Sequence, residues 1–145
     1  MRWLAVDPGE ARVGLAICDP EERLAVPLEV VPASAAFPAI RAIVAREEVG
    51  GVVIGLPLLP SGDEGEAVVM ARRLGARIER TLDVTLVYED ERLTTVAAEA
   101  HAREAGTSAR PSADLAATIL LEQFLGQRRQ AETDAARGTG VDSTA

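Results

Sequence analysis

Short apolar runs separated by turn residues predict β-strands in the first part of the chain. Residues 2–7 and 13–18 form two such runs, which are joined by a tight turn containing a Pro-Gly pair. Residues 25–31 form a third run, in which Pro27 is typical of an edge strand. The pattern therefore predicts three consecutive strands that form a meander.

Beyond the meander, helical and strand patterns alternate. Ser34 can cap a helix, and residues 52–56 are apolar on both faces, as expected of a central parallel strand. The predicted elements are a helix that begins at Ser34 and stops before the glycine pair at 50–51, a strand at 52–56, a helix at 67–78, a strand at 84–88, a helix from 94 or 95 to 105 and a last helix at 112–126. This order predicts an α/β fold with a mixed five-stranded sheet, in which a three-strand meander is followed by parallel strands, flanked by helices on both faces.

Length and composition predict one globular domain. The chain has 145 residues, of which 48% are hydrophobic. We place the domain at residues 1–126, because residues 127–145 are polar and aperiodic and predict a disordered tail. No apolar run is long enough to span a membrane, and we expect no signal peptide. Cys18 is the single cysteine, so we expect a buried thiol in a protein of the reducing cytoplasm.

The charged residues argue against several classes of function. The chain has no lysine, which rules out a P-loop, and a single histidine, His101, which argues against a Ser-His-Asp triad or a His-rich zinc site. The net charge of −8 argues against a basic nucleic-acid-binding protein. A nucleic-acid role would therefore require a local cluster of arginines and bound metal ions. Aromatic residues make up 3% of the chain, which leaves little for stacking on bases and favours contacts to the nucleic-acid backbone.

Three acidic residues lie at strand ends or at a helix start, where ligands gather in such sheets. Asp7 ends the first strand, Glu91 closes an acidic run after the fifth strand, and Asp114 lies in the first turn of the last helix. If the first and fifth strands lie near each other, these carboxylates converge and suit Mg²⁺ or Mn²⁺. Gly9 and Gly14 leave room beside Asp7 for a phosphate or for another backbone.

Each acid also has a simpler interpretation. Asp7 is a good turn former, acids after a strand are commonly solvated, and Asp114 is well placed to complement the helix dipole. The metal-site hypothesis therefore depends on the three positions taken together.

Four segments, in this order and spacing, resemble the YqgF family of RuvX-like pre-16S rRNA nucleases, which are also described as Holliday junction resolvases. The segments are Asp7-Pro-Gly-Glu-Ala-Arg12-Val-Gly14-Leu-Ala16, Val53-Ile-Gly-Leu-Pro57 with Gly62 after it, Asp90-Glu91-Arg92-Leu-Thr-Thr95, and Leu115-Ala-Ala-Thr-Ile-Leu120. The resemblance covers about residues 1–126. It implies a ribonuclease H-like fold, a cytoplasmic location and a role in maturing the 5′ end of 16S rRNA.

The resemblance also implies roles for individual residues. Asp7 and Glu91 would be metal-binding catalytic acids, and Arg12 and Arg92 would organise the site or contact phosphates. Arg110, beside the start of the last helix, is a further candidate for a contact to the nucleic-acid backbone.

The chain departs from the family at one position. The family places its third catalytic aspartate where this chain has Ala113, and the aspartate here is the next residue, Asp114. One residue turns a side chain by about 100° around a helix. Either Asp114 still reaches the metal ions, or the chain keeps only two of the family's ligands.

Together these observations predict a nuclease that hydrolyses phosphodiester bonds with Mg²⁺ or Mn²⁺ held by Asp7, Glu91 and Asp114. The expected substrate is a structured rRNA precursor, with branched DNA as the alternative. A second alternative is a non-catalytic protein of this fold that binds ribosomal or transcription components, which Ala113 and the acidic charge favour. An actin-like ATPase also uses an Asp-x-Gly hairpin, but it needs two such lobes, and only one fits in 145 residues. The sequence leaves monomer and homodimer both open.

Overall fold

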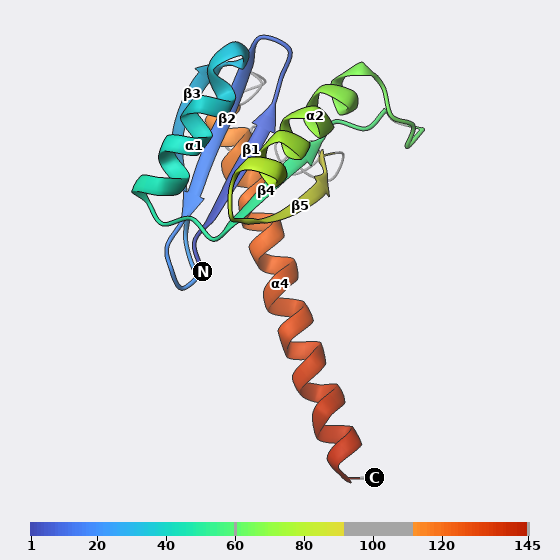
Figure 1. Cartoon of the computed structure of the whole chain (residues 1–145). Helices are drawn as coiled ribbons and strands as arrows, with labels where there is room; N and C mark the ends of the chain where they lie inside the picture. Colours follow the sequence, from blue (N-terminus) through green and yellow to red (C-terminus); the bar gives the residue numbers. More distant parts are fainter. Residues whose placement is uncertain (60, 92–111, 145) are drawn as a thin grey trace, which may run out of the picture.

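The computed structural model describes residues 1–59, 61–91 and 112–144. The elements in this part of the chain are β1 (Trp3–Pro8), β2 (Arg12–Cys18), β3 (Ala25–Pro32), a short 3₁₀ helix η1 (Ala33–Ala35), α1 (Ala36–Arg46), β4 (Gly51–Leu56), α2 (Glu66–Thr81), β5 (Thr85–Asp90) and α4 (Ala113–Thr144) (Figure 1). The helix predicted at 94–105 lies outside the described residues.

The strands form one five-stranded sheet in the order β3-β2-β1-β4-β5. β1 pairs antiparallel with β2, and β2 pairs antiparallel with β3, whereas β4 lies parallel to β1 and β5 lies parallel to β4. The predicted mixed sheet, a meander followed by parallel strands, is therefore confirmed. β1 is its central strand, so the end of β1 lies in the middle of one edge of the sheet.

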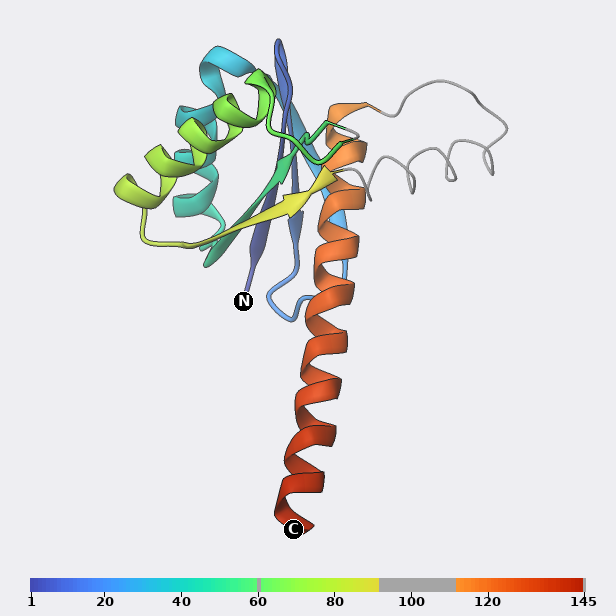
Figure 2. The same cartoon turned by 90° about the vertical axis from the view of Figure 1, so that its right-hand side faces the viewer.

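Helices cover both faces of the sheet, as the sequence predicted. α1 and α2 lie on one face and α4 lies on the other (Figure 2). Alternate residues of β1 face the two sides of the sheet. Leu4 and Val6 pack in the cluster that includes α1 and α2. Trp3 and Ala5 pack in the cluster that includes α4. β1 is therefore buried on both faces, which holds its end rigidly in place.

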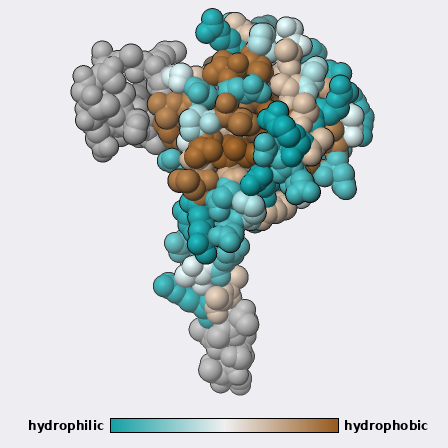
Figure 3. All heavy atoms as spheres, turned by 90° about the vertical axis from the view of Figure 1, so that its left-hand side faces the viewer, coloured by the Kyte–Doolittle hydropathy of each residue, from teal (hydrophilic) through white to brown (hydrophobic). Residues whose placement is uncertain are grey.

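β3 forms one edge of the sheet, and the edge-strand interpretation of Pro27 is confirmed. A register shift opposite Leu15 and Ala16 interrupts its pairing with β2. Leu24, Val26 and Val30 are exposed there, on the side of the molecule where Figure 3 shows a hydrophobic area. Pro27 lacks an N–H for a further ladder, which limits pairing of this edge with another strand.

Two local predictions differ from the structure. Ser34 does not cap α1, because residues 33–35 form η1 and the N-cap of α1 is Ala35, without a side-chain hydrogen bond. Residues 127–144, which the sequence predicts as part of a disordered tail, continue α4 to Thr144. Its residues form helical side-chain contacts over four residues, such as Gln130 Nε2 to Asp134 Oδ1 at 3.1 Å. No helix in the described ranges combines the length and apolar character needed to cross a bilayer.

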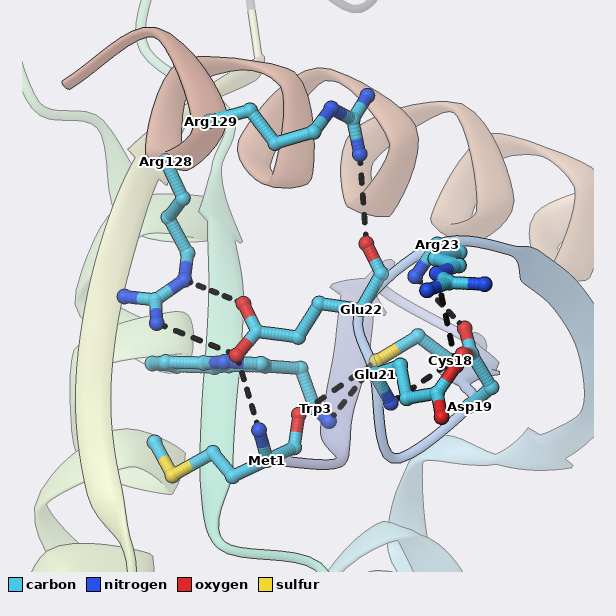
Figure 4. Close-up of polar contacts among 9 residues, drawn as sticks. All are labelled: Met1, Trp3, Cys18, Asp19, Glu21, Glu22, Arg23, Arg128 and Arg129. Carbon is cyan, nitrogen blue, oxygen red and sulfur yellow. Dashed lines mark hydrogen bonds and ion pairs between the residues drawn. The ribbon is translucent and has the colours of Figure 1, made fainter. Parts of the chain in front are cut away.

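The middle of α4 is anchored to the β2–β3 turn by Arg128 (Figure 4). Arg128 Nε donates a hydrogen bond to Glu22 Oε1 at 2.7 Å. Oε2 of the same carboxylate accepts a hydrogen bond from the amino group of Met1 at 2.9 Å. The guanidinium also lies 4.9 Å from the centre of the Trp3 ring, which packs edge-on against Phe124. These contacts hold α4 across the sheet below the start of the helix.

Cys18 is a buried free thiol beside this anchor, in agreement with the sequence prediction. Its Sγ accepts the backbone N–H of Trp3 at 3.1 Å. Burial raises the pKa of the thiol above its usual value. Cys18 therefore serves as a small core residue.

Candidate active site

Asp7 lies at the end of β1, directly opposite Gly14 in β2. The turn after it is closed by a hydrogen bond from the backbone N–H of Gly9 to the carbonyl oxygen of Arg12 at 2.9 Å. A Cβ on Gly9 would lie 2.7 Å from that oxygen, so this turn requires glycine. The carboxylate of Asp7 is thus presented from a rigid hairpin at the centre of the sheet edge.

Glu91 follows β5 directly, and only β4 separates β5 from β1. Because parallel strands end at the same edge of a sheet, Asp7 and Glu91 reach the same place. Gly55 of β4 lies between them, and a Cβ there would be 2.2 Å from Oε1 of Glu91. The side chain of Glu91 therefore lies across Gly55, through space that any other residue would fill.

Asp7 and Glu91 share a hydrogen bond between their carboxyl groups. Burial, the hydrogen bond to Asp7 and the negative charges of Asp7 and Asp90 raise the pKa of Glu91 to about 10. Burial also raises the pKa of Asp7, although the hydrogen bond from Glu91 opposes this. At neutral pH, Glu91 accordingly holds a proton and donates it toward the carboxylate of Asp7.

Two carboxyl groups that must share a proton form a donor set that suits a divalent cation. They are hard oxygen ligands at one sheltered place, and a cation could replace the shared proton and remove the repulsion between them. The residues present therefore fit Mg²⁺ or Mn²⁺. This is the convergence of the first and fifth strands that the sequence analysis required.

Asp114 begins α4 close to Asp7 in the fold, but it does not form a three-residue metal-binding group with Asp7 and Glu91. A Cβ on Gly14 would lie 1.9 Å from the carbonyl oxygen of Ala113, so the start of α4 packs directly on β2 at Gly14. Gly14 is the residue of β2 that pairs with Asp7 of β1. Asp114 Oδ1, however, accepts the backbone N–H of Leu115 at 3.0 Å. In the described ranges, no three acidic, histidine or cysteine residues form a group that could hold a metal ion.

The structure places one of the three candidate arginines. Arg12 is exposed at the start of β2, beside the turn that follows Asp7. Arg92 and Arg110 lie outside the described residues. The sequence left open whether a phosphate or another backbone approaches Gly14. In the structure the backbone of α4 at Ala113 makes this close approach. The role of Gly55 was missed, although a glycine inside an apolar central strand is a signal of close approach.

Comparison with known proteins gives consistent relatives. A family model described as "RuvX: Holliday junction resolvase" matches residues 1–127. A protein of Maridesulfovibrio salexigens named "Putative pre-16S rRNA nuclease" is 37% identical over 134 residues, which cover 88% of this chain and 99% of that protein. A protein of the same name from Anaeromyxobacter sp. is 41% identical over 83% of this chain and 93% of its own length.

A solved structure supports the fold. T. thermophilus RuvC in complex with a Holliday junction substrate matches with a TM-score of 0.61 at 18% identity, covering 89% of this chain and 96% of that chain. The ribonuclease H-like fold that the resemblance implied is thereby confirmed.

Proposed function

This chain belongs to the RuvX family, and from that premise we propose that it is a metal-dependent nuclease that hydrolyses phosphodiester bonds in the 5′ extension of the 16S rRNA precursor. The pre-16S rRNA substrate comes from the name of the relatives, the 5′ end comes from what the sequence resemblance implies, and the chemistry comes from the site. The observation that carries the proposal is the pair of carboxyl groups, Asp7 and Glu91, held together at the centre of the sheet edge.

In this mechanism Asp7 and Glu91 are the residues that would hold the cation. A bound divalent cation would supply an acidified water and offset the negative charge of the phosphodiester. Asp7 is presented by a rigid hairpin and needs no rearrangement, whereas Glu91 must release its proton before it can act as a ligand. Cation affinity should therefore rise with pH over the range in which Glu91 is protonated.

We assign further residues to the same site. Asp114 is the proposed third ligand, and it would have to exchange its contact with Leu115 for the site. Arg12, Arg92 and Arg110 are the proposed phosphate contacts. Residues 1–126 are the proposed nuclease domain, which agrees with the family match over residues 1–127, and we propose a cytoplasmic location.

Branched DNA is the second candidate substrate, because the matching family model is described as a Holliday junction resolvase. Both substrates present phosphodiesters to the same carboxylates. The test is cleavage of a precursor rRNA fragment that carries the 5′ extension, alongside a four-way DNA junction, by the full chain with Mn²⁺ or Mg²⁺.

Variants distinguish the site from a contaminant. Asp7→Asn should abolish cleavage, whereas Glu10→Gln, which removes an exposed carboxylate two residues beyond the turn proline, should leave it unchanged. Cleavage of neither substrate, or equal cleavage by Asp7→Asn, would overturn the proposal. Asp114→Asn tests the third ligand: a loss of Mn²⁺ affinity of tenfold or more supports it, and unchanged affinity leaves two ligands.

A further inference from the structure

The layer formed by α1 and α2 is basic in a chain of net charge −8. These two helices together contain six arginines and two glutamates, and α1 contains no acid at all. The remainder of the chain is therefore more acidic than its net charge suggests. Such an asymmetry concentrates positive charge on one face of the sheet, the face opposite α4 (Figure 2).

Four of the arginines form an exposed surface, which we call the helix-layer arginines: Arg41, Arg73, Arg77 and Arg80. The last three recur at intervals of four and three residues along α2, so they share one side of the helix. That side is opposite the buried residues of α2, which are Val68, Ala71, Gly75 and Ile78. The three arginines thus form a row about 10 Å long that points to solvent.

Phe37 joins this row to α1. The guanidinium of Arg77 lies 3.9 Å from the centre of the Phe37 ring, and that of Arg41 lies 5.8 Å from the same centre. Each contact is a cation–π interaction, which holds a guanidinium in place while leaving its N–H groups available. Two positive charges are therefore kept at one place on the surface.

The helix-layer arginines are not neutralised by acids of the described ranges. The other two arginines of these helices have ion pairs, Arg46 with Glu47 at 3.2 Å and Arg72 with Glu64. No described acid forms an ion pair with any of the four.

The two glutamates of α2 do not lie among the arginines of the row. Glu79 lies on the side that faces β5. Burial raises the pKa of Tyr88 there, and the charge of Glu79 adds to this rise while that of Arg72 opposes it. Glu66 shares the side of the row but precedes Arg73 by almost two helical turns, about 10 Å along the axis. Neither acid interrupts the row of arginines.

From this arrangement we propose that the helix-layer arginines bind the sugar-phosphate backbone of the nucleic-acid substrate at a distance from the cleaved bond. The inference rests on the proposed nuclease function. Arginine presents a planar fork that matches phosphate oxygens, and a row of guanidinium groups that no described acid neutralises matches a row of phosphates. This surface resolves the conflict between the acidic net charge and a nucleic-acid substrate.

The position of the surface sets its role. α2 begins after the loop that leaves β4, and Gly55 of β4 borders the carboxyl pair. From the start of α2, Arg73 is about 10 Å along the helix axis and Arg80 is about 21 Å. Only a substrate that extends several nucleotides beyond the cleaved bond can reach these residues, so the surface favours long, structured RNA over short fragments.

The test compares two triple variants of the full chain. The first is Arg73→Gln, Arg77→Gln and Arg80→Gln. The control removes the same charge from exposed arginines outside α1 and α2 and consists of Arg23→Gln, Arg129→Gln and Arg137→Gln. Binding of a fluorescent RNA stem with a 5′ single-stranded extension is measured by anisotropy with EDTA, which prevents metal-dependent cleavage, and melting temperatures confirm that both variants fold.

The first variant is expected to bind the RNA at least tenfold more weakly, and the slope of log affinity against log salt should fall by about two. The control should stay within twofold of the wild type. Equal weakening in both variants, no weakening in the first, or no binding by the wild type would overturn the inference.

A small phosphodiester, bis(p-nitrophenyl) phosphate, separates this inference from the proposed function. It is too short to reach α2, so its Mn²⁺-dependent hydrolysis should be equal in the wild type and in the first variant. Absence of hydrolysis in the wild type, with RNA binding still dependent on the helix-layer arginines, would count against the nuclease and support the surface.

Discussion

Replacing Glu91 by glutamine should stabilise the fold at neutral pH and destroy the proposed metal site. The amide of glutamine can donate a hydrogen bond to Asp7, as the protonated carboxyl group does, and it has nearly the same shape. It does not ionise. The variant therefore keeps the local packing. It removes only the loss of folding free energy that arises because the carboxyl group ionises less readily in the folded chain than in the unfolded one.

The size of the effect follows from the two pKa values. The pKa of Glu91 is about 10 in the folded chain and 4.5 as the ordinary value. Between these values the folded state binds more protons than the unfolded state, so stability is greatest below pH 4.5 and falls as pH rises toward 10. The slope is about 1.4 kcal/mol per pH unit, or about 4 kcal/mol at pH 7.5. Glu91 is half-buried, and screening by solvent reduces this to about 2 kcal/mol.

Urea and thermal unfolding between pH 5 and 8.5, without divalent cations, measure this difference. A gain of about 2 kcal/mol corresponds to a rise in Tm of about 4–8 °C at this chain length. The wild type should lose stability across the range, Glu91→Gln should lose much less, and Glu10→Gln should follow the wild type. Mn²⁺ should stabilise the wild type and leave Glu91→Gln unchanged. A less stable Glu91→Gln at pH 8, or a wild type whose stability does not change with pH, would refute the reasoning.

Three further variants test the packing around the site. Gly55→Ala should lower Mn²⁺ affinity at least tenfold, because its Cβ would lie 2.2 Å from Oε1 of Glu91; adding Glu91→Asp, whose side chain is shorter, should restore part of the affinity. Gly14→Ala should cost about 3 kcal/mol of folding stability in urea unfolding, because its Cβ would lie 1.9 Å from the carbonyl oxygen of Ala113 and force α4 outward. Arg128→Ala should lower the free energy of unfolding by about 1 kcal/mol above pH 4.5. The hydrogen bond from Arg128 lowers the pKa of Glu22, so this difference should diminish as pH falls and Glu22 is protonated.

The glycine variants have matched controls in the same chain. A Cβ on Gly65 would meet only Leu59 atoms at 3.8 Å, so Gly65→Ala should leave Mn²⁺ affinity unchanged. A Cβ on Gly126, within α4, would meet nothing closer than 3.9 Å, so Gly126→Ala should raise stability by about 0.5–1 kcal/mol. Unchanged affinity in Gly55→Ala, or unchanged stability in Gly14→Ala, would contradict the close approaches. An Arg128→Ala deficit that is no smaller at pH 2 than at pH 7 would contradict the role given to Glu22.

Local pattern was sufficient for much of the fold. The strands and helices within the described ranges lie close to their predicted positions, because apolar periodicity reports which residues face a core. The edge position of β3 could be predicted from Pro27, since a missing N–H is tolerated only there. Predictions that relied on one residue type were weaker: Ser34 does not cap α1, since η1 takes its place. The polar segment after Gly126 was expected to be disordered, yet it continues α4.

By itself, the sequence determined which acids end strands, which glycines leave room and which family the motifs resemble, because these properties depend on residues near one another in the chain. Only the tertiary structure decided that Asp7 and Glu91 share a proton and that Gly55 leaves the space for the side chain of Glu91. It also decided that Asp114 accepts the backbone N–H of Leu115. The physical reason is that such contacts depend on strand order, which places β4 alone between β1 and β5. They also depend on clearances of a few tenths of an ångström between packed elements, which spacing along the chain does not specify.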